Sequence, residues 1–364
     1  MRILVNCQSG IGINILAVPT LRAIKINYPD SYVHLIVQFR AGAKLLKSCP
    51  YIDEISVMNY EMARSPGILY RFVKNIRKKQ YDYSFMLFPG NRLDKNIFHR
   101  LVNTKRRISH DYLYRKNLNF NFLNDTRIEI DRNAHDVEQN LGLLSVLDID
   151  PVTQSKELEL FLSPDSLNSA DEILLDITKH KNIVGIHAGS SKDLTMELKR
   201  WPSGYFAELV DSLKELYDCE VLLFGSRDEE PVKQAIKAKA ESGCEIVGMI
   251  DIQTTAALIR KCSLFVSNDS GLMHIAAAVG VRTVGIFGPT DPVRTAPYGA
   301  EHFVVKRDLD CSPCFSINHV GKKINCQRKE RDCLVELKPE FVMNKIREKI
   351  GNVLTEEVKA NAHN

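Results

Sequence analysis

One segment constrains the fold of this chain more than any other: residues 262–290, with the sequence CSLFVSNDSGLMHIAAAVGVRTVGIFGPT. An apolar run ends in the polar turn Ser267-Asn268-Asp269-Ser270-Gly271, and a run of small apolar residues and a second apolar run follow it. This order predicts a strand, a turn, a helix and a second, parallel strand. The turns after two parallel strands meet at one edge of the sheet, where open α/β folds bind their ligands.

The turn before the predicted helix has the chemistry of a phosphate site. The first N–H groups of a helix have no partner within it and carry partial positive charge, so Ser270 and Gly271 are expected to bind a phosphate. The Asp269 carboxylate cannot hold a phosphate and is expected to accept hydrogen bonds from a sugar or from those N–H groups. His274 lies one turn further on the same face, where it would orient a phosphate or the Asp269 carboxylate; a buried, hydrogen-bonded histidine is the alternative.

Two other groups of residues accompany this segment. The N-terminus has a strand pattern at residues 3–5 and then Gly10-Ile11-Gly12, and the middle of the chain has HAGSS at 187–191 and KRWP at 199–202. In this order, and over nearly the whole chain, the three motifs resemble glycosyltransferase family 9, which contains the ADP-heptose:lipopolysaccharide heptosyltransferases. The resemblance implies a GT-B architecture, in which two doubly wound, parallel-sheet (Rossmann-like) domains face a central cleft.

Strand and helix patterns alternate through both halves of the chain and predict an α/β fold with parallel sheets. In the first half the predicted elements are 3–6, 14–27, 33–37, 55–57, 66–79, 83–88, 107–109 and 136–147; in the second they include 183–187, 205–217, 221–224, 254–261 and 339–350. With the resemblance, we expect an acceptor-side domain over residues 1–160, a nucleotide-sugar-binding domain over 161–350 and a frayed tail over 351–364.

Length and composition exclude several classes of protein. A chain of 364 residues favours two domains, and 44% hydrophobic with 26% charged residues is typical of a soluble globular protein. No apolar run reaches the roughly 18 residues of a membrane span, and the N-terminus lacks the pattern of a secretory signal, so we expect a cytoplasmic protein. A net charge of +4 does not indicate a nucleic-acid partner.

Basic residues gather in one part of the first half. They are Lys95, Arg100, Lys105, Arg106, Arg107, Arg115 and Lys116. One hypothesis is contact with an anionic surface, either membrane lipid or a phosphorylated glycolipid acceptor, which would place the protein at the periphery of the inner membrane. A solvated helix and loop face is the alternative.

The nine cysteines fall into two groups. Those beside apolar runs are expected to be small buried side chains, since a cytoplasmic chain rarely forms disulfides. Cys311, Cys314, Cys326 and Cys333 instead lie in a polar, basic stretch, and four thiolates could converge on a structural zinc ion. Free thiols that pack a loop are the alternative, because the later pair is separated by six residues and not by the usual two.

For the donor side, we expect Lys199 to supply the positive charge that stabilises a departing nucleotide diphosphate, with Asp269 as the second catalytic residue. The resemblance implies transfer without a metal ion. Ser190 and Ser191 could donate to phosphate oxygens, and a loose resemblance places Glu229 near the nucleotide ribose. The single tryptophan, Trp201, is expected to pack against the start of a helix and not to stack on a base.

The loop after the first strand does not match the dinucleotide fingerprint, since Ile15 stands where the third glycine belongs. The resemblance instead implies that this loop, with Gly10, Gly12 and Asn14, faces the acceptor. Family members typically have an aspartate after the second glycine, proposed as the base for the acceptor hydroxyl. This chain has Ile13, which cannot accept a proton.

We therefore expect an inverting, metal-independent glycosyltransferase that moves a sugar, heptose from ADP-heptose in the first instance, to a lipopolysaccharide-core or related glycolipid acceptor. No cofactor is expected for catalysis. Because of Ile13, two alternatives stay open. One is a transferase with another donor or acceptor, and the other is a nucleotide-sugar-binding or scaffold protein that has lost its base.

Overall fold

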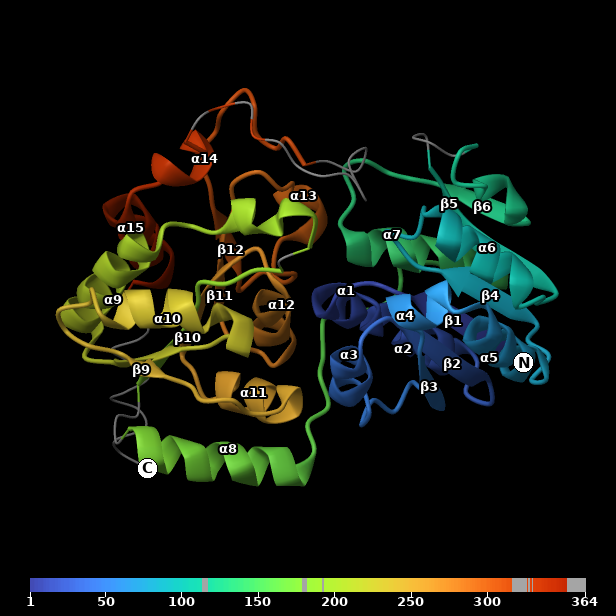
Figure 1. Cartoon of the computed structure of the whole chain (residues 1–364), viewed down its shortest axis with the longest axis horizontal. Coiled ribbons are helices and arrows are strands. Elements are labelled where there is room, and N and C mark those ends of the chain that lie inside the picture. The colour runs from blue at the N-terminus through green and yellow to red at the C-terminus, as the bar shows by residue number, and fades with distance from the viewer. Residues whose placement is uncertain are drawn as a thin grey trace. The chain divides into compact units, whose positions relative to one another are not determined.

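The computed structural model of the chain describes residues 1–112, 117–178, 182–191, 193–315, 326, 328 and 330–351 (Figure 1). Its internal contacts divide it into two compact units, Met1–Phe161 and Leu162–Asn364, each built around its own parallel sheet. The predicted α/β class is therefore confirmed, while the acceptor and donor roles of the two halves stay predictions. The predicted tail beyond residue 351 lies outside the described residues. Within the described ranges no helix is long and apolar enough to cross a membrane.

The first unit contains a six-stranded sheet in the order β3-β2-β1-β4-β5-β6, with every neighbouring pair parallel. Its strands are β1 (Arg2–Cys7), β2 (Tyr32–Val37), β3 (Glu54–Val57), β4 (Tyr83–Met86), β5 (Arg106–Asp111) and β6 (Thr126–Glu129). Its helices are α1 (Ile11–Leu16), α2 (Val18–Asn27), α3 (Arg40–Leu45), α4 (Tyr60–Arg64), α5 (Pro66–Arg77), α6 (Leu93–Leu101) and α7 (Asp136–Gly142), with 3-10 turns at Asn121–Leu123 and Leu143–Leu147.

Apolar side chains on both faces of the inner strands explain this layering. Every residue of β1 and β2 after the first is buried, as expected when helices cover both sides of a parallel sheet. The helix predicted over 14–27 is in fact two helices, because α1 ends at Leu16 and α2 begins at Val18. Pro19 lies in the first turn of α2, where its missing N–H removes no helical hydrogen bond.

The second unit repeats the design with a sheet in the order β12-β11-β10-β7-β8-β9, again parallel throughout. Its strands are β7 (Ile183–His187), β8 (Glu220–Leu223), β9 (Glu245–Ile246), β10 (Leu264–Asn268), β11 (Thr283–Ile286) and β12 (Phe303–Val305). Its helices are α8 (Pro164–Ile177), α9 (Ser203–Tyr217), α10 (Glu230–Lys237), α11 (Ile252–Ile259), α12 (Gly271–Ala278), α13 (Pro292–Thr295), α14 (Asp332–Val335) and α15 (Pro339–Ile350), with 3-10 helices at Asp193–Lys199 and Arg227–Glu229.

Both units share one topology. The first strand of each sheet, β1 or β7, lies between the second strand and the fourth, so the order of the strands reverses there. The connections that leave the two central strands run in opposite directions and open a crevice at their carboxyl ends. The topology therefore predicts one ligand site at the ends of β1 and β4 and another at the ends of β7 and β10.

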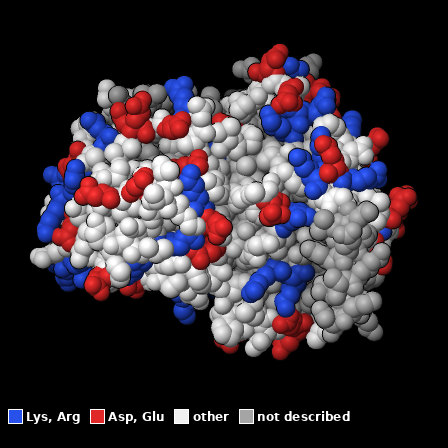
Figure 2. All heavy atoms as spheres, turned by 180° about the vertical axis from the view of Figure 1, so that it is seen from behind, with Lys and Arg blue, Asp and Glu red and all other residues white. Residues whose placement is uncertain are grey.

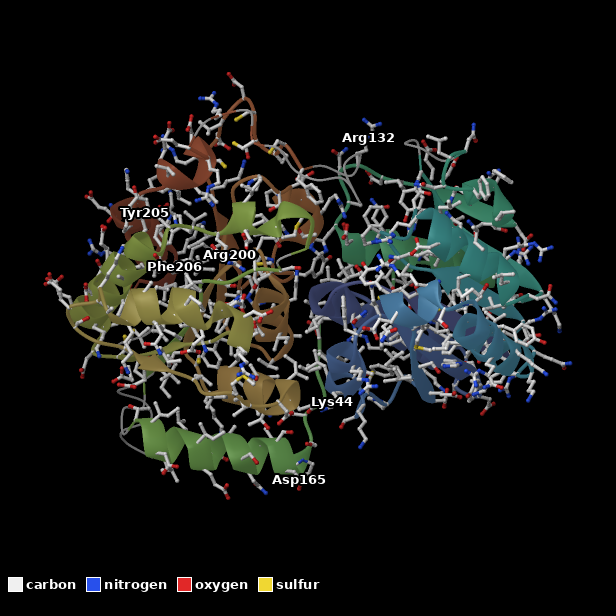
Figure 3. All side chains as sticks on the ribbon, in the orientation of Figure 1. Lys44, Arg132, Asp165, Arg200, Tyr205 and Phe206 are labelled. Carbon is white, nitrogen blue, oxygen red and sulfur yellow. The ribbon has the colours of Figure 1, made fainter. Side chains whose placement is uncertain are left out.

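The core of the second unit includes the single tryptophan. Trp201 is buried, and its ring packs edge-on against Tyr205 and Phe206. Both of these partners belong to the first turn of α9 (Figure 3). The Trp201 indole N–H donates to the Leu337 carbonyl at 2.7 Å. The prediction that Trp201 packs against the start of a helix is confirmed.

Gly185 leaves the space that β7 needs against β10. A Cβ at this position would come within 2.5 Å of Phe265 Cδ2 and 3.1 Å of Cys262 Sγ, and both of these side chains are buried. Gly185→Ala is therefore expected to destabilise the second unit by about 1–3 kcal/mol, the usual cost of overpacking a core. Chemical denaturation followed by circular dichroism measures this difference.

The matched control is Gly204→Ala in α9, where the nearest atom to the new Cβ is Lys239 Nζ at 3.9 Å. Alanine is the better helix former, so this change is expected to be neutral or to stabilise by up to about 1 kcal/mol. Equal stability of the two variants would contradict the tight packing assigned to Gly185.

Candidate active site

Polar side chains gather at the carboxyl edge of the second sheet, at the reversal point between β7 and β10. His187 ends β7, Asn268 ends β10, and Asp269 and Ser270 follow directly. Glu229 reaches the same edge from the 3-10 helix after β8 and contacts His187. The structure thus brings together three residues singled out from the sequence with two, His187 and Asn268, that were not.

The strongest electrostatic contact at this edge is the ion pair between Lys199 and Asp269. Lys199 Nζ lies 2.7 Å from Asp269 Oδ2, and the side chains are 15% and 7% exposed. Burial raises the pKa of Asp269, but the Lys199 ammonium, with smaller effects of His274 and Thr290, outweighs burial and lowers the pKa overall. Asp269 is therefore charged at neutral pH. Its carboxylate accepts a hydrogen bond from one of the three N–H groups of the Lys199 ammonium. The other two N–H groups can bind phosphate oxygens.

Hydrogen bonds hold the segment that carries Lys199. The Arg200 guanidinium donates to the Ser190 carbonyl at 2.7 Å and to Ser190 Oγ at 3.1 Å. Arg331 in turn donates to the Arg200 carbonyl at 3.2 Å. The segment is thereby tied to the loop after β7, which restricts where the ammonium can lie.

The Asn268 amide connects β10 to the loops on either side. Its Nδ2 donates to the carbonyls of Ala188 at 2.8 Å and Gly189 at 3.3 Å, and its Oδ1 accepts from the Trp201 N–H at 3.0 Å. Asn268 is completely buried, so its role is to position these loops and not to contact a ligand from solvent.

A chain of hydrogen bonds links the start of α12 to Glu229. Ser270 Oγ lies 2.8 Å from His187 Nδ1, and His187 Nε2 lies 3.2 Å from Glu229 Oε1. Ser226 donates its N–H and its hydroxyl to Glu229 Oε2 at 2.7 and 2.9 Å. Burial raises the pKa of Glu229, but His187 and Ser226 outweigh burial and bring the pKa down to about 2. A Cβ on Gly189 would lie 1.7 Å from Glu229 Oε1, so the loop needs glycine there.

The hydroxyl of Ser190 is already engaged within the protein. It donates to the Met196 carbonyl at 2.9 Å and accepts from Arg200, and the residue is buried. In this structure Ser190 therefore braces the loop. Phosphate binding by Ser190 and by the exposed Ser191 stays a prediction.

The predicted residues of α12 lie beside the ion pair. Ser270 caps the helix by accepting from the Met273 N–H at 3.5 Å, and Gly271 is its first residue. His274 is buried in the same helix, and its charge helps to lower the pKa of Asp269. The free end of α12 and the Lys199 ammonium therefore offer positive charge at one edge of the sheet.

The predicted acceptor-side loop of the first unit has structural roles. Asn14 is buried, and its Nδ2 donates to the Cys7 carbonyl at 2.9 Å and to Cys7 Sγ at 3.2 Å. Gly10 has a φ of −63°, which any residue adopts, and nothing would touch a Cβ there. Gly12 is buried in α1, and Ile13 lines a pocket. Contact of this loop with an acceptor stays a prediction.

The structural zinc site predicted at four cysteines is not confirmed by the structure. Among the residues that the structure describes, no group of three or more His, Cys, Asp and Glu side chains could hold a metal ion. Cys314 and Cys326 are exposed, Cys311 is half-buried and Cys333 is buried. Burial, followed by the other three thiols, raises the pKa of Cys333 to about 11, so this thiol is neutral when no metal ion is bound. Zinc binding by these four thiols is not confirmed and stays a prediction, so no chemistry is assigned to a metal here.

The described basic residues of the first unit do not all lie on the surface. Lys95 is buried and lines a pocket, so its place on a membrane-facing patch is wrong. Lys105 and Arg107 pair with aspartates at 2.6 and 2.5 Å, and Arg115 and Lys116 lie outside the described residues. On the face shown in Figure 2, Lys and Arg are mixed with Asp and Glu. Contact with an anionic membrane stays a prediction.

Solved structures identify the architecture as that of GT-B glycosyltransferases. The structure of the ADP-heptose lipopolysaccharide heptosyltransferase II of Escherichia coli is similar, with a TM-score of 0.72 and 23% identity over 98% of this chain and 99% of that one. A glycosyltransferase family 9 protein from Veillonella parvula gives a TM-score of 0.77 and 21% identity, with 98% and 97% covered. At these identities the likeness establishes the fold.

Sequence comparison then identifies the family. The pattern of glycosyltransferase family 9 (heptosyltransferase) matches residues 69–325. The lipooligosaccharide heptosyltransferase 2 of Campylobacter jejuni is 26% identical over 97% of this chain and 99% of that protein, and the lipopolysaccharide heptosyltransferase 2 of Salmonella typhimurium is 25% identical over 98% and 99%. This chain belongs to glycosyltransferase family 9 and is a glycosyltransferase, as the three motifs predicted.

The ionisation of Glu229 contributes to stability. Its pKa falls from an ordinary 4.5 to about 2, so the carboxylate stabilises the fold above pH 4.5, and this contribution of roughly 3 kcal/mol is lost as the pH falls toward 2. Glu229→Gln is therefore expected to cost up to about 3 kcal/mol at pH 7 and clearly less at about pH 3. Urea denaturation at the two pH values measures the difference.

Glu245→Gln is the matched control, because Glu245 pairs with Lys237 at an exposed site. It is expected to cost less than about 1 kcal/mol at either pH. A loss for Glu229→Gln that does not change with pH would mean that the charge of Glu229 is not what stabilises the loop.

Proposed function

We propose that this chain is an inverting, metal-independent heptosyltransferase that moves heptose from ADP-heptose to a lipopolysaccharide-core or related glycolipid acceptor. The names of the relatives in Escherichia coli and Campylobacter jejuni support the donor and the acceptor. The observation that carries the proposal is the Lys199–Asp269 pair beside the start of α12, at the reversal point of the sheet. A structural zinc is not part of this proposal.

The proposed reaction places a defined demand on the site. The acceptor hydroxyl attacks the anomeric carbon from the face opposite the diphosphate, and its proton passes to a base. The bond between the anomeric carbon and the diphosphate oxygen breaks, and the departing ADP keeps the electron pair. Negative charge therefore grows on the diphosphate, and fixed donors aimed at it stabilise the transition state more than the bound substrate.

Lys199 and the first N–H groups of α12 are the proposed donors for this charge. Asp269 holds the ammonium from one side and leaves its other N–H groups for the diphosphate. A helix start carries about half a positive elementary charge, which adds to the full charge of the lysine. Glu229, which stays ionised while it holds His187, is proposed to accept a hydrogen bond from the nucleotide ribose.

The proposed reaction also needs a base, and Ile13 cannot serve as one. We infer that a different group takes the proton from the acceptor hydroxyl. The same observation favours a second candidate function, in which the protein uses another donor or acceptor, or binds a nucleotide sugar without transferring it.

The ion pair can be tested directly by mutation. Lys199→Ala is expected to lower kcat by about a hundredfold to a thousandfold, the usual cost of removing one donor to developing charge. Asp269→Ala is expected to lower kcat as well, because the ammonium loses the partner that holds it in place. Release of ADP from ADP-heptose in the presence of a lipopolysaccharide acceptor lacking heptose measures turnover.

Lys237→Ala is the control, since it removes a lysine from an exposed ion pair of the same unit. It is expected to leave turnover unchanged, and circular dichroism checks that all three variants are folded. Normal turnover in both Lys199→Ala and Asp269→Ala would refute the assignment of the site.

Calorimetry with ADP, UDP and GDP, followed by a donor-hydrolysis assay, separates the candidate functions. The proposal requires a preference for ADP together with transfer. A preference for UDP or GDP would indicate another donor, and binding without turnover would indicate a scaffold protein.

A glycolipid acceptor is anchored in a membrane by its lipid part, so we also propose a cytoplasmic location with peripheral contact at the inner membrane. Arg106→Glu together with Arg107→Glu is expected to weaken sedimentation with anionic vesicles, and more so at low salt. Vesicle binding that is equal to that of the unchanged protein would remove this part of the proposal.

A further inference from the structure

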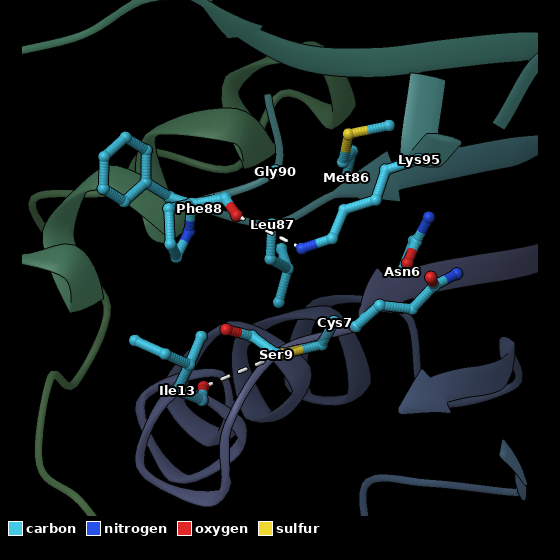
Figure 4. Close-up of a pocket in the computed structure, with 11 residues that line it drawn as sticks. Asn6, Cys7, Ser9, Ile13, Met86, Leu87, Phe88, Gly90 and Lys95 are labelled. Atoms are coloured by element: carbon cyan, nitrogen blue, oxygen red, sulfur yellow. Dashed lines mark hydrogen bonds between the residues drawn. The ribbon is translucent and has the colours of Figure 1, made fainter. Parts of the chain in front are cut away.

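The reversal point of the first sheet also has a pocket (Figure 4). It is lined by the carboxyl ends of β1 and β4, by the loop after β4, by Ile13 of α1 and by Lys95 of α6. The Lys95 side chain extends from α6 into the pocket. This is the place where the topology of an open parallel sheet predicts a ligand.

Lys95 is a buried cation that forms no ion pair with any acidic side chain among the residues that the structure describes. It is 7% exposed, and the one hydrogen bond of its Nζ within the described part of the chain goes to the Pro89 carbonyl, at the long distance of 3.5 Å. Asp94 is the nearest acid to affect it, and Asp94 is held at both oxygens by Arg92. A buried charge is normally paired, because removing it from water is costly.

Asn6 is a second unsatisfied group of the same pocket. It is 1% exposed, and neither its amide nitrogen nor its amide oxygen has a hydrogen-bond partner in the described part of the chain. Buried amides are almost always paired, so an unpaired one requires an explanation. The neighbouring Cys7 needs none, because its thiol donates to the Ile13 carbonyl and accepts from Asn14.

We propose that this pocket binds an oxyanion, a carboxylate or a phosphate of the acceptor glycan, between the Lys95 ammonium and the Asn6 amide. The assignment to the acceptor rests on the proposed function, whereas the oxyanion site does not. An oxyanion supplies the missing negative charge and accepts a hydrogen bond from the amide N–H group. A neutral sugar hydroxyl can accept the hydrogen bond but supplies no charge.

The charges around the pocket agree with this assignment. Burial, with a smaller effect of Arg92, lowers the pKa of Lys95 to about 8, while Asp94 and Cys7 act weakly in the other direction. Burial raises the pKa of the Cys7 thiol to about 11, so it is neutral and does not compete with the ligand. The site therefore carries its positive charge at neutral pH, and we expect oxyanion affinity to fall as the pH rises through about 8.

The experiment uses the full chain with Lys199→Ala, so that an anion does not bind at the ion pair of the second unit. Calorimetry with glucuronate and with glucose 6-phosphate tests the carboxylate and the phosphate, and glucose is the neutral control. We expect one site for at least one of the two anions and none for glucose. Failure of both anions to bind would overturn the proposal.

Two variants then locate the site. Adding Lys95→Met is expected to weaken binding of the anion by about tenfold or more, because a charge-assisted hydrogen bond is lost. Adding Ile13→Asp places a carboxylate at the pocket and is expected to weaken binding of the anion as strongly, because the two negative charges repel each other. Lys105→Met removes the same charge from an exposed position of the same unit and is expected to have no effect. Equal affinity with and without Lys95→Met would overturn the proposal.

Transfer kinetics test the acceptor separately in a chain with an intact Lys199. Lys95→Met is expected to raise KM for the acceptor about tenfold and to leave KM for the donor unchanged. Anion binding at Lys95 with an unchanged acceptor KM would overturn the assignment to the acceptor and keep the oxyanion site. Absence of any transfer would count against the proposed function, while the calorimetric result on the pocket would stand by itself.

Discussion

The reversal of strand order in each sheet is the constraint on which both sites depend. Helices cover both faces of a parallel sheet, so a ligand approaches it at the ends of its strands. The order reverses between β1 and β4 in the first unit and between β7 and β10 in the second. The ion pair of the second unit and the pocket of the first lie at these two places, although the side chains that line them differ completely.

The two places also differ in how their buried polar groups are satisfied. In the second unit Lys199 pairs with Asp269, and His187 is hydrogen-bonded to Glu229, so these polar side chains have partners without a ligand. In the first unit Lys95 and the Asn6 amide lack such partners among the described residues. A site whose polar groups are already paired keeps its geometry when no ligand is bound, which suits a reaction that needs fixed hydrogen-bond donors. A site with unpaired buried groups is stabilised most by a ligand that pairs with those groups.

Much of the fold could be predicted because the inner strands are apolar on both faces, and β7 and α15 begin and end where the sequence pattern places them. β6 and α6 were missed: β6 is a short edge strand with alternating charged residues, and α6 has charges that obscure its apolar face. In the site, Lys199, Asp269 and Ser270 could be predicted from the motifs. His187 and Asn268 belong to the same motifs, but their roles could not be predicted because they act through partners far away in the sequence. Lys95 was assigned to a basic surface, because sequence neighbours do not reveal that one lysine of a charged run is buried.

Asn268 has no charge, no reactive atom and no contact with solvent, yet its hydrogen bonds hold together the loops at the carboxyl edge of the second sheet. An aspartate there would lose the N–H donors, a leucine would lose the acceptor as well, and a glutamine would be one methylene too long for a closely packed interior. A search for functional residues among reactive or accessible side chains would pass over it. Substitution of Asn268 would therefore disturb both loops at once, whereas Ile13 lines a pocket and has no comparable hydrogen-bonding role.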